Sequence, residues 1–321
     1  MIFEKKVVNL YKKILVHRHD PDGSVFYFSH RDFEGLCREE LSFTGDKGQR
    51  LQAYLYYRGE KRYDTLVVLE HGMGCGHAAY LREVNEITER GYTVFTYDHT
   101  GTLNSEGEDI GGFSQSLADL DRAIDFVHTI KGYEGARLAV IGHSWGGFST
   151  MNIPALHPEI SHVVALSGFI SPKAIQEQVL TGLLKLYRKP IYKTELDAFP
   201  SYCHFDGRES LRGARTRALI IHSRDDHVCS FDKHFKALEA ALSECDNVEL
   251  LALDGKKHNP TYSDKAVGLL WDFNSALREK NKKKALTTPE KKAEFVASFD
   301  WWAITEQDKD VWDKIFAFIE S

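Results

Sequence analysis

The chain has 321 residues, of which 42% are hydrophobic and 27% charged, and its formal net charge at pH 7 is -6. This length allows a sizeable buried core, and the composition is that of an ordinary globular protein. The net negative charge argues against a nucleic-acid partner.

The amino-terminal 16 residues place apolar side chains at helical spacing between lysines, which predicts an amphipathic helix packed on the main body. They contain no apolar run of signal-peptide length, and no part of the chain approaches the roughly 18 uncharged apolar residues of a membrane helix. We therefore expect a cytoplasmic protein without a membrane span.

Residues 17–20, His-Arg-His-Asp, precede Pro-Asp-Gly and favour a solvated turn over a metal site. The five cysteines lack C-x-x-C spacing, which predicts reduced thiols.

Strand and helix patterns alternate over most of the chain. Residues 39–43 and 51–57 alternate in polarity on either side of a glycine-containing turn, which predicts an antiparallel hairpin at the edge of a larger sheet. Six further strands are predicted at 65–69, 93–97, 138–141, 162–166, 218–222 and 248–253. Helices are predicted at 78–90, 114–129, 147–156 and 231–242. This alternation is typical of an α/β fold with a mostly parallel central sheet flanked by helices.

Two long segments interrupt the alternation. The connection 170–215 is far longer than a usual link between a strand and the next element, and it contains helical and aromatic residues. We expect it to form a helical lid inserted over the site, with a minority of its side chains facing substrate. Residues 260–321 should form a helical carboxyl-terminal extension, with helices near 263–280, 290–297 and 306–319. Both segments are expected to belong to a single domain spanning residues 1–321.

The most informative stretch is Leu138 to Thr150, LAVIGHSWGGFST. Its first four residues form an apolar run that predicts a buried central strand, and the run ends at Gly142. The next residues complete a G-x-S-x-G sequence, which is typical of a sharp turn between a strand and a helix that exposes a nucleophilic serine. Ser144 is therefore the candidate nucleophile. A serine hydroxyl is a weak nucleophile by itself, so a base and an orienting acid are expected later in the chain.

Candidates for both partners follow later strands. The strand 218–222 leads into a loop containing Asp225 and Asp226, and the strand 248–253 leads into a loop containing His258. The order serine, aspartate, histidine is that of α/β-hydrolases and differs from the orders of chymotrypsin-like and subtilisin-like enzymes. Neighbouring side chains on an extended loop point in different directions, so only one aspartate can orient His258.

At this point the chain resembles the α/β-hydrolase family, whose acid loop often has the form Gly-x-x-Asp. Ser223 stands where that glycine would be, and the third residue after it is Asp226, which favours Asp226 while Asp225 stays the alternative. One oxyanion-binding amide is expected from Trp145, the residue after the nucleophile. The sequence His71-Gly72-Met73 resembles the family's His-Gly-x loop, which implies Met73 as the second donor. The glycine spacing of that loop fits neither a dinucleotide-binding fingerprint nor a Walker loop.

The segment from Tyr97 to Gly107 is similar to the Asp-x-x-Gly-x-x-x-Ser-x-Gly segment of monoglyceride lipase-like, cinnamoyl esterase-like and serine aminopeptidase-like hydrolases. The resemblance covers about Leu41 to Leu166 and resumes from Ala218 to Asn259. It implies a serine hydrolase with a Ser144, His258 and Asp226 triad that needs no cofactor and no metal.

The expected substrate is a small-molecule acyl ester, because the segment 170–215 offers apolar side chains more readily than a charged pocket. Two alternatives stay open. A serine aminopeptidase would need carboxylates such as Glu177, Glu195 or Asp197 to hold a substrate amine. A non-catalytic binding protein on the same fold would usually lack one member of the triad. The sequence makes no prediction of oligomeric state.

Overall fold

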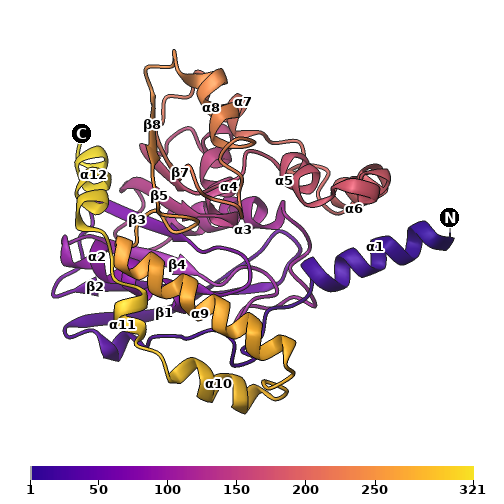
Figure 1. The fold of residues 1–321 in the computed structure, drawn as a ribbon. Coiled ribbons are helices and arrows are strands. Elements are labelled where there is room, and N and C mark those ends of the chain that lie inside the picture. The colour runs from indigo at the N-terminus through magenta and orange to yellow at the C-terminus, as the bar shows by residue number, and fades with distance from the viewer. Residues whose placement is uncertain (1) are drawn as a thin grey trace.

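The computed structural model describes residues 2–321, and its centre is an 8-stranded sheet (Figure 1). The strands are β1 (Leu36–Thr44), β2 (Arg50–Arg58), β3 (Thr65–Glu70), β4 (Thr93–Tyr97), β5 (Arg137–His143), β6 (His162–Leu166), β7 (Arg217–Ser223) and β8 (Val248–Leu253). Their order is β1-β2-β4-β3-β5-β6-β7-β8. The β1–β2 and β2–β4 pairs are antiparallel and all other pairs are parallel. The predicted α/β architecture with an antiparallel edge hairpin is therefore confirmed.

Helices cover both faces of the sheet because the central strands are apolar on both sides. In β5, Val140 packs into the cluster that contains α3 (Gln115–Val127), α4 (Trp145–Asn152) and α8 (Phe235–Leu242). Its neighbour Ile141 points the other way, into the cluster that contains α2 (Leu81–Glu89) and α12 (Lys309–Ile319). Short 3₁₀ helices η1 (His30–Asp32), η2 (His77–Tyr80) and η3 (Ile153–Ala155) complete these layers. The alternation along each strand thus fixes a three-layer arrangement.

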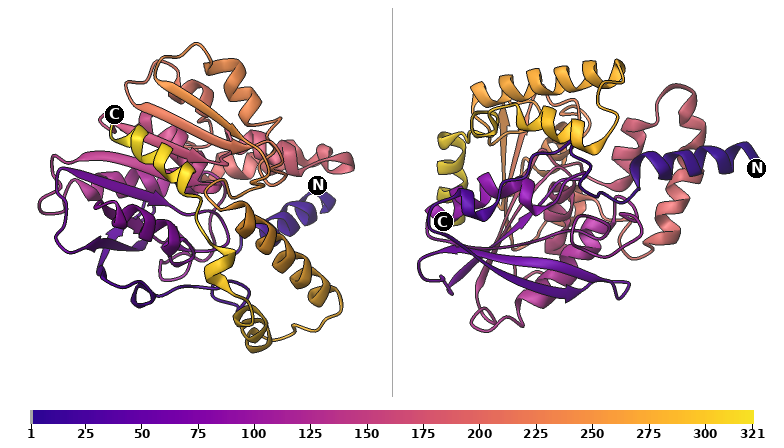
Figure 2. Two further views of the ribbon diagram at one scale, coloured as in Figure 1. Left: turned by 60° about the vertical axis from the view of Figure 1, so that its left-hand side comes forward. Right: turned by 90° about the horizontal axis from the view of Figure 1, so that it is seen from below.

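The segment 170–215 carries α5 (Pro172–Val179), η4 (Gly182–Tyr187), α6 (Arg188–Ala198) and α7 (Gly207–Leu211). Leu180 and Ile191 are buried in the main core, whereas Leu183 and Leu186 are 84% and 77% exposed. Figures 1 and 2 show α5 and α6 at one side of the molecule, projecting beyond the sheet, whereas α7 lies beside α8. Its apolar residues are therefore divided between the core and solvent.

Helix α1 (Ile2–Leu15) corresponds to the predicted amphipathic segment, whose first residue, Met1, lies outside the described residues. It lies beside α6 and η4 (Figure 1). Val7 and Leu15 pack against the core, but Leu10 and Ile14 are 56% and 58% exposed. Only part of the expected apolar face is therefore buried.

The carboxyl-terminal residues form α9 (Asp264–Lys282), α10 (Pro289–Ala297), α11 (Trp301–Ile304) and α12, and α11 lies outside the predicted helices. Figure 2 shows α9 and α10 outside the sheet, whereas α12 packs on it. The ring of Phe26 stacks on that of Trp301 with their centroids 5.2 Å apart. The loop that contains Phe26 therefore packs against the carboxyl-terminal extension. Within residues 2–321, none of the helices combines the length and apolar character needed to cross a bilayer.

Candidate active site

Ser144 occupies the turn between β5 and α4, at the carboxyl end of the sheet. Its backbone has a φ of 57° and a ψ of -109°, a conformation that costs about 1–3 kcal/mol for a residue with a side chain. Its amide donates a hydrogen bond of 2.8 Å to the carbonyl oxygen of Leu166 on the neighbouring strand. The elbow predicted from the G-x-S-x-G sequence therefore forms, with Ser144 as the residue in the unusual conformation.

The glycines on either side of Ser144 are required by close backbone approach. A Cβ atom at Gly142 would lie 2.3 Å from the carbonyl oxygen of Gly146. A Cβ atom at Gly146 would lie 2.6 Å from the carbonyl oxygen of Glu70, at the end of β3. Both distances are shorter than real Cβ contacts, so any side chain at these positions would force the elbow apart.

His258 and Asp226 come together from the loops that follow β8 and β7. The Nδ1–H of His258 donates to Oδ2 of Asp226 at 2.8 Å. The other carboxylate oxygen, Oδ1, accepts the amides of Val228 and Cys229 at 2.8 Å and 3.1 Å. Burial opposes ionisation of Asp226, but hydrogen bonds from His222 and His258 outweigh it and hold the pKa of Asp226 well below its usual value. The fully buried carboxylate is therefore ionised and fixed in orientation.

Asp225 has different contacts. Its Oδ1 accepts the hydroxyl of Ser223 at 2.6 Å and the amide of Lys257 at 3.0 Å. These bonds join the loop after β7 to the residue that precedes His258. Asp225 thus ties the two loops together, whereas Asp226 contacts the imidazole itself.

Among the hydrogen bonds of residues 2–321, none joins the hydroxyl of Ser144 to the imidazole of His258. The Ser144 side chain lies against the thiol of Cys229, whose pKa is raised by burial. In sites without substrate, the bond between nucleophile and base is often long or misaligned and forms only in the complex. In the described structure, the Ser144 hydroxyl and the His258 imidazole are therefore not joined by a hydrogen bond.

The amides of Met73 and Trp145 make no hydrogen bond within the described part of the chain. Trp145 is the first residue of α4, and the first amides of a helix have no acceptor inside the helix. The neighbouring amide of Gly72, in contrast, donates to the hydroxyl of Tyr80 at 2.9 Å. The two amides predicted to bind an oxyanion are therefore both free to donate.

Tyr80 and His143 form a link that the sequence patterns did not reveal. The Tyr80 hydroxyl accepts the Gly72 amide and donates to Nδ1 of His143 at 2.7 Å. The Nε2–H of His143 donates to the carbonyl oxygen of His258, also at 2.7 Å. Burial and the nearby His258 lower the pKa of His143 to about 3, so its ring is neutral as this chain of bonds requires. These bonds connect the loop after β3, the elbow after β5 and the loop after β8.

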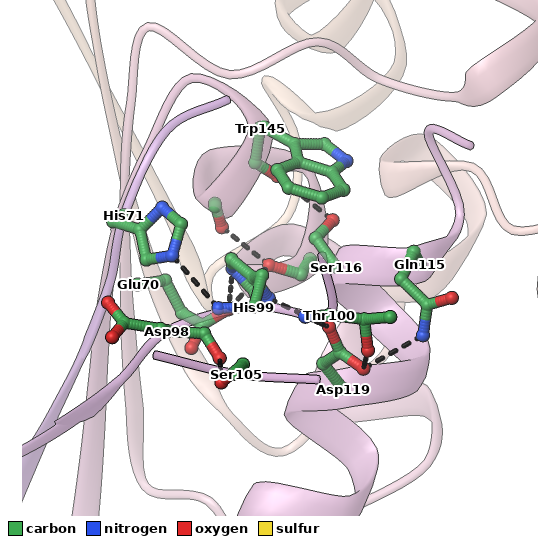
Figure 3. Close-up of polar contacts among 12 residues, drawn as sticks. Glu70, His71, Asp98, His99, Thr100, Ser105, Gln115, Ser116, Asp119 and Trp145 are labelled. Atoms are coloured by element: carbon green, nitrogen blue, oxygen red, sulfur yellow. Dashed lines mark hydrogen bonds and ion pairs between the residues drawn. The ribbon is translucent and has the colours of Figure 1, made fainter. Parts of the chain in front are cut away.

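A buried network lies beneath Trp145, with His99 at its centre in Figure 3. Nδ1 of His99 lies 3.2 Å from Asp119, and Nε2 lies 3.4 Å from Glu70. Burial opposes protonation of His99, but the charges and hydrogen bonds of these two carboxylates outweigh it and raise the pKa of His99 to about 9. The ring of His99 packs against that of Trp145 at 4.8 Å. A charged, fully buried cluster thus supports the residue that carries one of the free amides.

The amide of His99 donates to Nε2 of His71 at 3.1 Å. This bond joins the segment after β4 to the start of the loop after β3. The polar residues of that loop are also engaged, since His77 bonds Asp98 at 2.8 Å and Tyr56 at 3.1 Å. Both ring nitrogens of His77 are therefore engaged in hydrogen bonds within the protein.

A groove of about 370 Å³ borders His258. One wall consists of Val228 from the loop after β7 and Lys257 from the loop after β8. The other is α9, which contributes Leu270, Trp271 and further residues towards its carboxyl end. The Trp271 ring lies beneath the Lys257 ammonium, at 4.5 Å. The lining is mainly apolar and contains no residue of the segment 170–215. The carboxyl-terminal extension therefore contacts the surroundings of His258 directly.

Comparisons with known proteins agree with this fold. A family model described as serine aminopeptidase, S33, matches residues 61–204, which include Ser144 but end before Asp226 and His258. The chain is also similar to RutD of Azorhizobium caulinodans, a protein named as a carbamate hydrolase. The two are 25% identical over 201 residues, which are 50% of this chain and 74% of RutD.

Solved structures extend the similarity over most of the chain. The esterase Pf2001 of Pyrococcus furiosus superposes with a TM-score of 0.59 and 18% identity, covering 82% of this chain and 98% of the esterase. An acetyl xylan esterase from Paenibacillus sp. R4 gives a TM-score of 0.56 and 18% identity, covering 80% of this chain and 88% of that enzyme. With its sheet order, its nucleophile elbow and these similarities, the chain has the α/β-hydrolase fold and is similar to serine hydrolases.

Proposed function

We propose that the protein hydrolyses acyl esters through an acyl-enzyme formed on Ser144. The observation that carries this proposal is the 2.8 Å bond between His258 and a buried, ionised Asp226, at the same edge of the sheet as the strained Ser144. Asp226 keeps the proton of His258 on Nδ1, which leaves Nε2 free to accept the proton of the Ser144 hydroxyl. The serine oxygen then attacks the substrate carbonyl carbon.

The attack places a negative charge on the carbonyl oxygen. The amides of Met73 and Trp145 would donate to this oxyanion, and each such donor contributes about 3 kcal/mol in related chemistry. His258 then returns its proton to the leaving alcohol, which departs as the ester bond breaks. A water molecule, deprotonated by the same imidazole, attacks the acyl-enzyme and releases the carboxylic acid and the free Ser144.

The groove beside His258 supports an ester with an apolar group. Its apolar lining residues are Val228, Val267, Leu270, Trp271 and Leu277, and each methylene buried against them would stabilise the bound state by about 0.8 kcal/mol. We infer that the segment 170–215 and α9 together enclose the substrate, with Trp271 as the largest apolar residue beside His258.

A serine aminopeptidase is the second candidate, because the matching family model carries that description. Two of the carboxylates considered for binding a substrate amine are already engaged. Glu195 accepts the amides of Ser114 and Phe113 at 2.6 Å and 3.3 Å, and Asp197 pairs with Lys193 at 2.7 Å. These contacts favour the esterase over the peptidase.

A panel of nitrophenyl esters of increasing acyl length, measured beside amino-acyl anilides with free amines, tests the proposal. We expect the specificity constant to rise with chain length and to fall once the groove is full. Faster hydrolysis of the anilides than of every ester, dependent on the free amine, would replace the esterase by the aminopeptidase.

A further inference from the structure

A second cavity, of about 270 Å³, lies on the α12 side of the sheet and adjoins the groove beside His258, with which it shares Asn259, Asn274 and Leu277. It lies where residues 24–28 and the helices α9, α11 and α12 meet the ends of β3 and β6. Its walls are largely aromatic and aliphatic, with contributions from Phe26, Phe28, Leu69, Phe273, Trp301 and Trp312. A cavity of about 150 Å³ holds one benzene ring, so this one has room for a ring with a short side chain.

Three polar side chains in the cavity wall have oxygen atoms without partners in the described structure. Glu83 is 4% exposed, and its Oε2 is buried without a hydrogen bond, while its Oε1 has only a long bond of 3.4 Å from Gln307. The hydroxyls of Tyr262 and Thr261 also have no hydrogen bond within residues 2–321, but neither oxygen is fully buried, so of the three only the Glu83 oxygen is a buried atom without a partner. Buried polar atoms usually have partners, and leaving one unpaired costs about 1–3 kcal/mol.

The electrostatics of these groups agree with a shared site. Burial raises the pKa of Glu83 to about 7. Burial also raises the pKa of Tyr262, and the Glu83 carboxylate, which lines the same cavity, raises it further. A cation that paired with Glu83 would remove most of this cost, because a buried carboxylate is stabilised by an opposite charge.

The cavity is separated from the nucleophile. Tyr80 and His143 line it, and both are held by the hydrogen bonds that connect the catalytic loops. Ser144, Met73 and Trp145 do not line it. A molecule in the cavity would therefore touch the back of the Tyr80–His143 pair and not the reacting atoms.

We propose that this cavity binds a primary amine attached to an aromatic body, at a site distinct from the one that holds the ester. The ring occupies the space between Trp301 and Trp312, and the ammonium group donates to Oε2 of Glu83. An ammonium group has three donors, and the hydroxyls of Tyr262 and Thr261 can accept the remaining two. This site requires the carboxyl-terminal extension, which supplies 8 of its 20 lining residues.

Tryptophan fluorescence measures this binding directly, since Trp301 and Trp312 both line the cavity. The probe is 2-phenylethylamine at pH 8, and 2-phenylethanol and propylbenzene are the uncharged comparison compounds of similar shape. Glu83→Gln keeps the size of the side chain but removes its charge, and Thr261→Val removes one acceptor. Glu89→Gln is the matched control, because Glu89 lies on the same helix but at the surface and outside the cavity.

We expect the amine to bind more tightly than the alcohol or the hydrocarbon. Its affinity should fall about tenfold or more in Glu83→Gln and less in Thr261→Val, and stay within about twofold in Glu89→Gln. Equal binding of the three probes, or an unchanged amine affinity in Glu83→Gln, would overturn the proposal.

The same titration on enzyme whose Ser144 carries a phosphonate label tests whether the two sites are distinct. We expect the amine affinity to be unchanged by the label, and loss of binding would show that the cavity is part of the substrate pocket. If Ser144 does not react with the label, the function proposed above fails, while the comparison of Glu83→Gln with Glu89→Gln still decides the amine site.

Discussion

The carboxylates of the adjacent residues Asp225 and Asp226 have different hydrogen-bond partners. The carboxylate of Asp226 bonds the His258 imidazole, whereas that of Asp225 bonds the Ser223 hydroxyl and the Lys257 amide. Removing the charge of Asp226 would allow the wrong tautomer of His258, and removing that of Asp225 would only loosen a loop. This difference makes the triad acid testable by two matched substitutions.

Asp226→Asn should therefore lower kcat for an ester substrate by about three orders of magnitude or more. Asp225→Asn should cost far less, because its contacts do not involve the imidazole. Steady-state kinetics of the two variants, with folding checked by circular dichroism, measures the ranking. A larger loss in Asp225→Asn would reassign the acid.

The contacts of single residues also show why sequence patterns predicted only part of the site. Ser144, His258 and the two aspartates follow strands in an order that the fold constrains, so they could be proposed before any geometry was known. Tyr80 and His143 could not, because their link depends on three loops that meet only in the folded sheet. His143 could be seen inside the G-x-S-x-G sequence, but the residues next to it in the chain did not indicate that it bonds to Tyr80 and to the carbonyl oxygen of His258.

At the scale of elements, α9 lies closer to the candidate site than its position in the chain suggests. Trp271 on α9 lines the groove beside His258, between the side chains of Lys257 and Arg278. The sequence assigned substrate contacts to the segment 170–215 because of its length and aromatic content. That expectation did not consider α9, whose helical pattern carries no signal of where it packs.

Trp271→Ala should lower kcat/KM for long-chain esters by about tenfold or more and affect acetate esters much less, because the lost contact is with the apolar group. Trp302→Ala is the matched control, since Trp302 is 46% exposed, similar to 48% for Trp271, and lies outside the groove. An equal effect on short and long esters would show that Trp271 does not contact the acyl chain.

At the scale of the whole molecule, the carboxyl-terminal extension completes the core on one face of the sheet. Trp312 and Phe316 of α12 pack with β-strand residues such as Ile141, and the loop around Phe26 packs on α11. The strands and most helices were predictable from periodicity, since each pattern is local. The closure of the extension around a cavity was not, because it depends on contacts between segments more than 200 residues apart.

Glu83 makes the stability of the molecule depend on pH. The folded state raises the pKa of Glu83 from about 4.5 to about 7, so between these values the folded state keeps a proton that the unfolded state has released. Unfolding free energy should therefore fall as pH rises through this window. Glu83→Gln does not titrate and should gain about 2–3 kcal/mol over the natural protein between pH 4.5 and pH 8.

Urea denaturation at several pH values measures this difference, with Glu89→Gln as the control on the same helix. Comparing each variant with the natural protein at the same pH cancels the titration of all other groups. A difference that stays constant from pH 4.5 to pH 8 would mean that Glu83 titrates normally.

Covalent labelling of Ser144 tests the central claim most directly. Intact-mass spectrometry of the protein after treatment with a fluorophosphonate should show a single adduct, and peptide mapping should place it on Ser144. Ser144→Ala should show no adduct and no ester hydrolysis above background. Labelling at another residue, or ester hydrolysis that persists in Ser144→Ala, would contradict the proposal that Ser144 is the nucleophile.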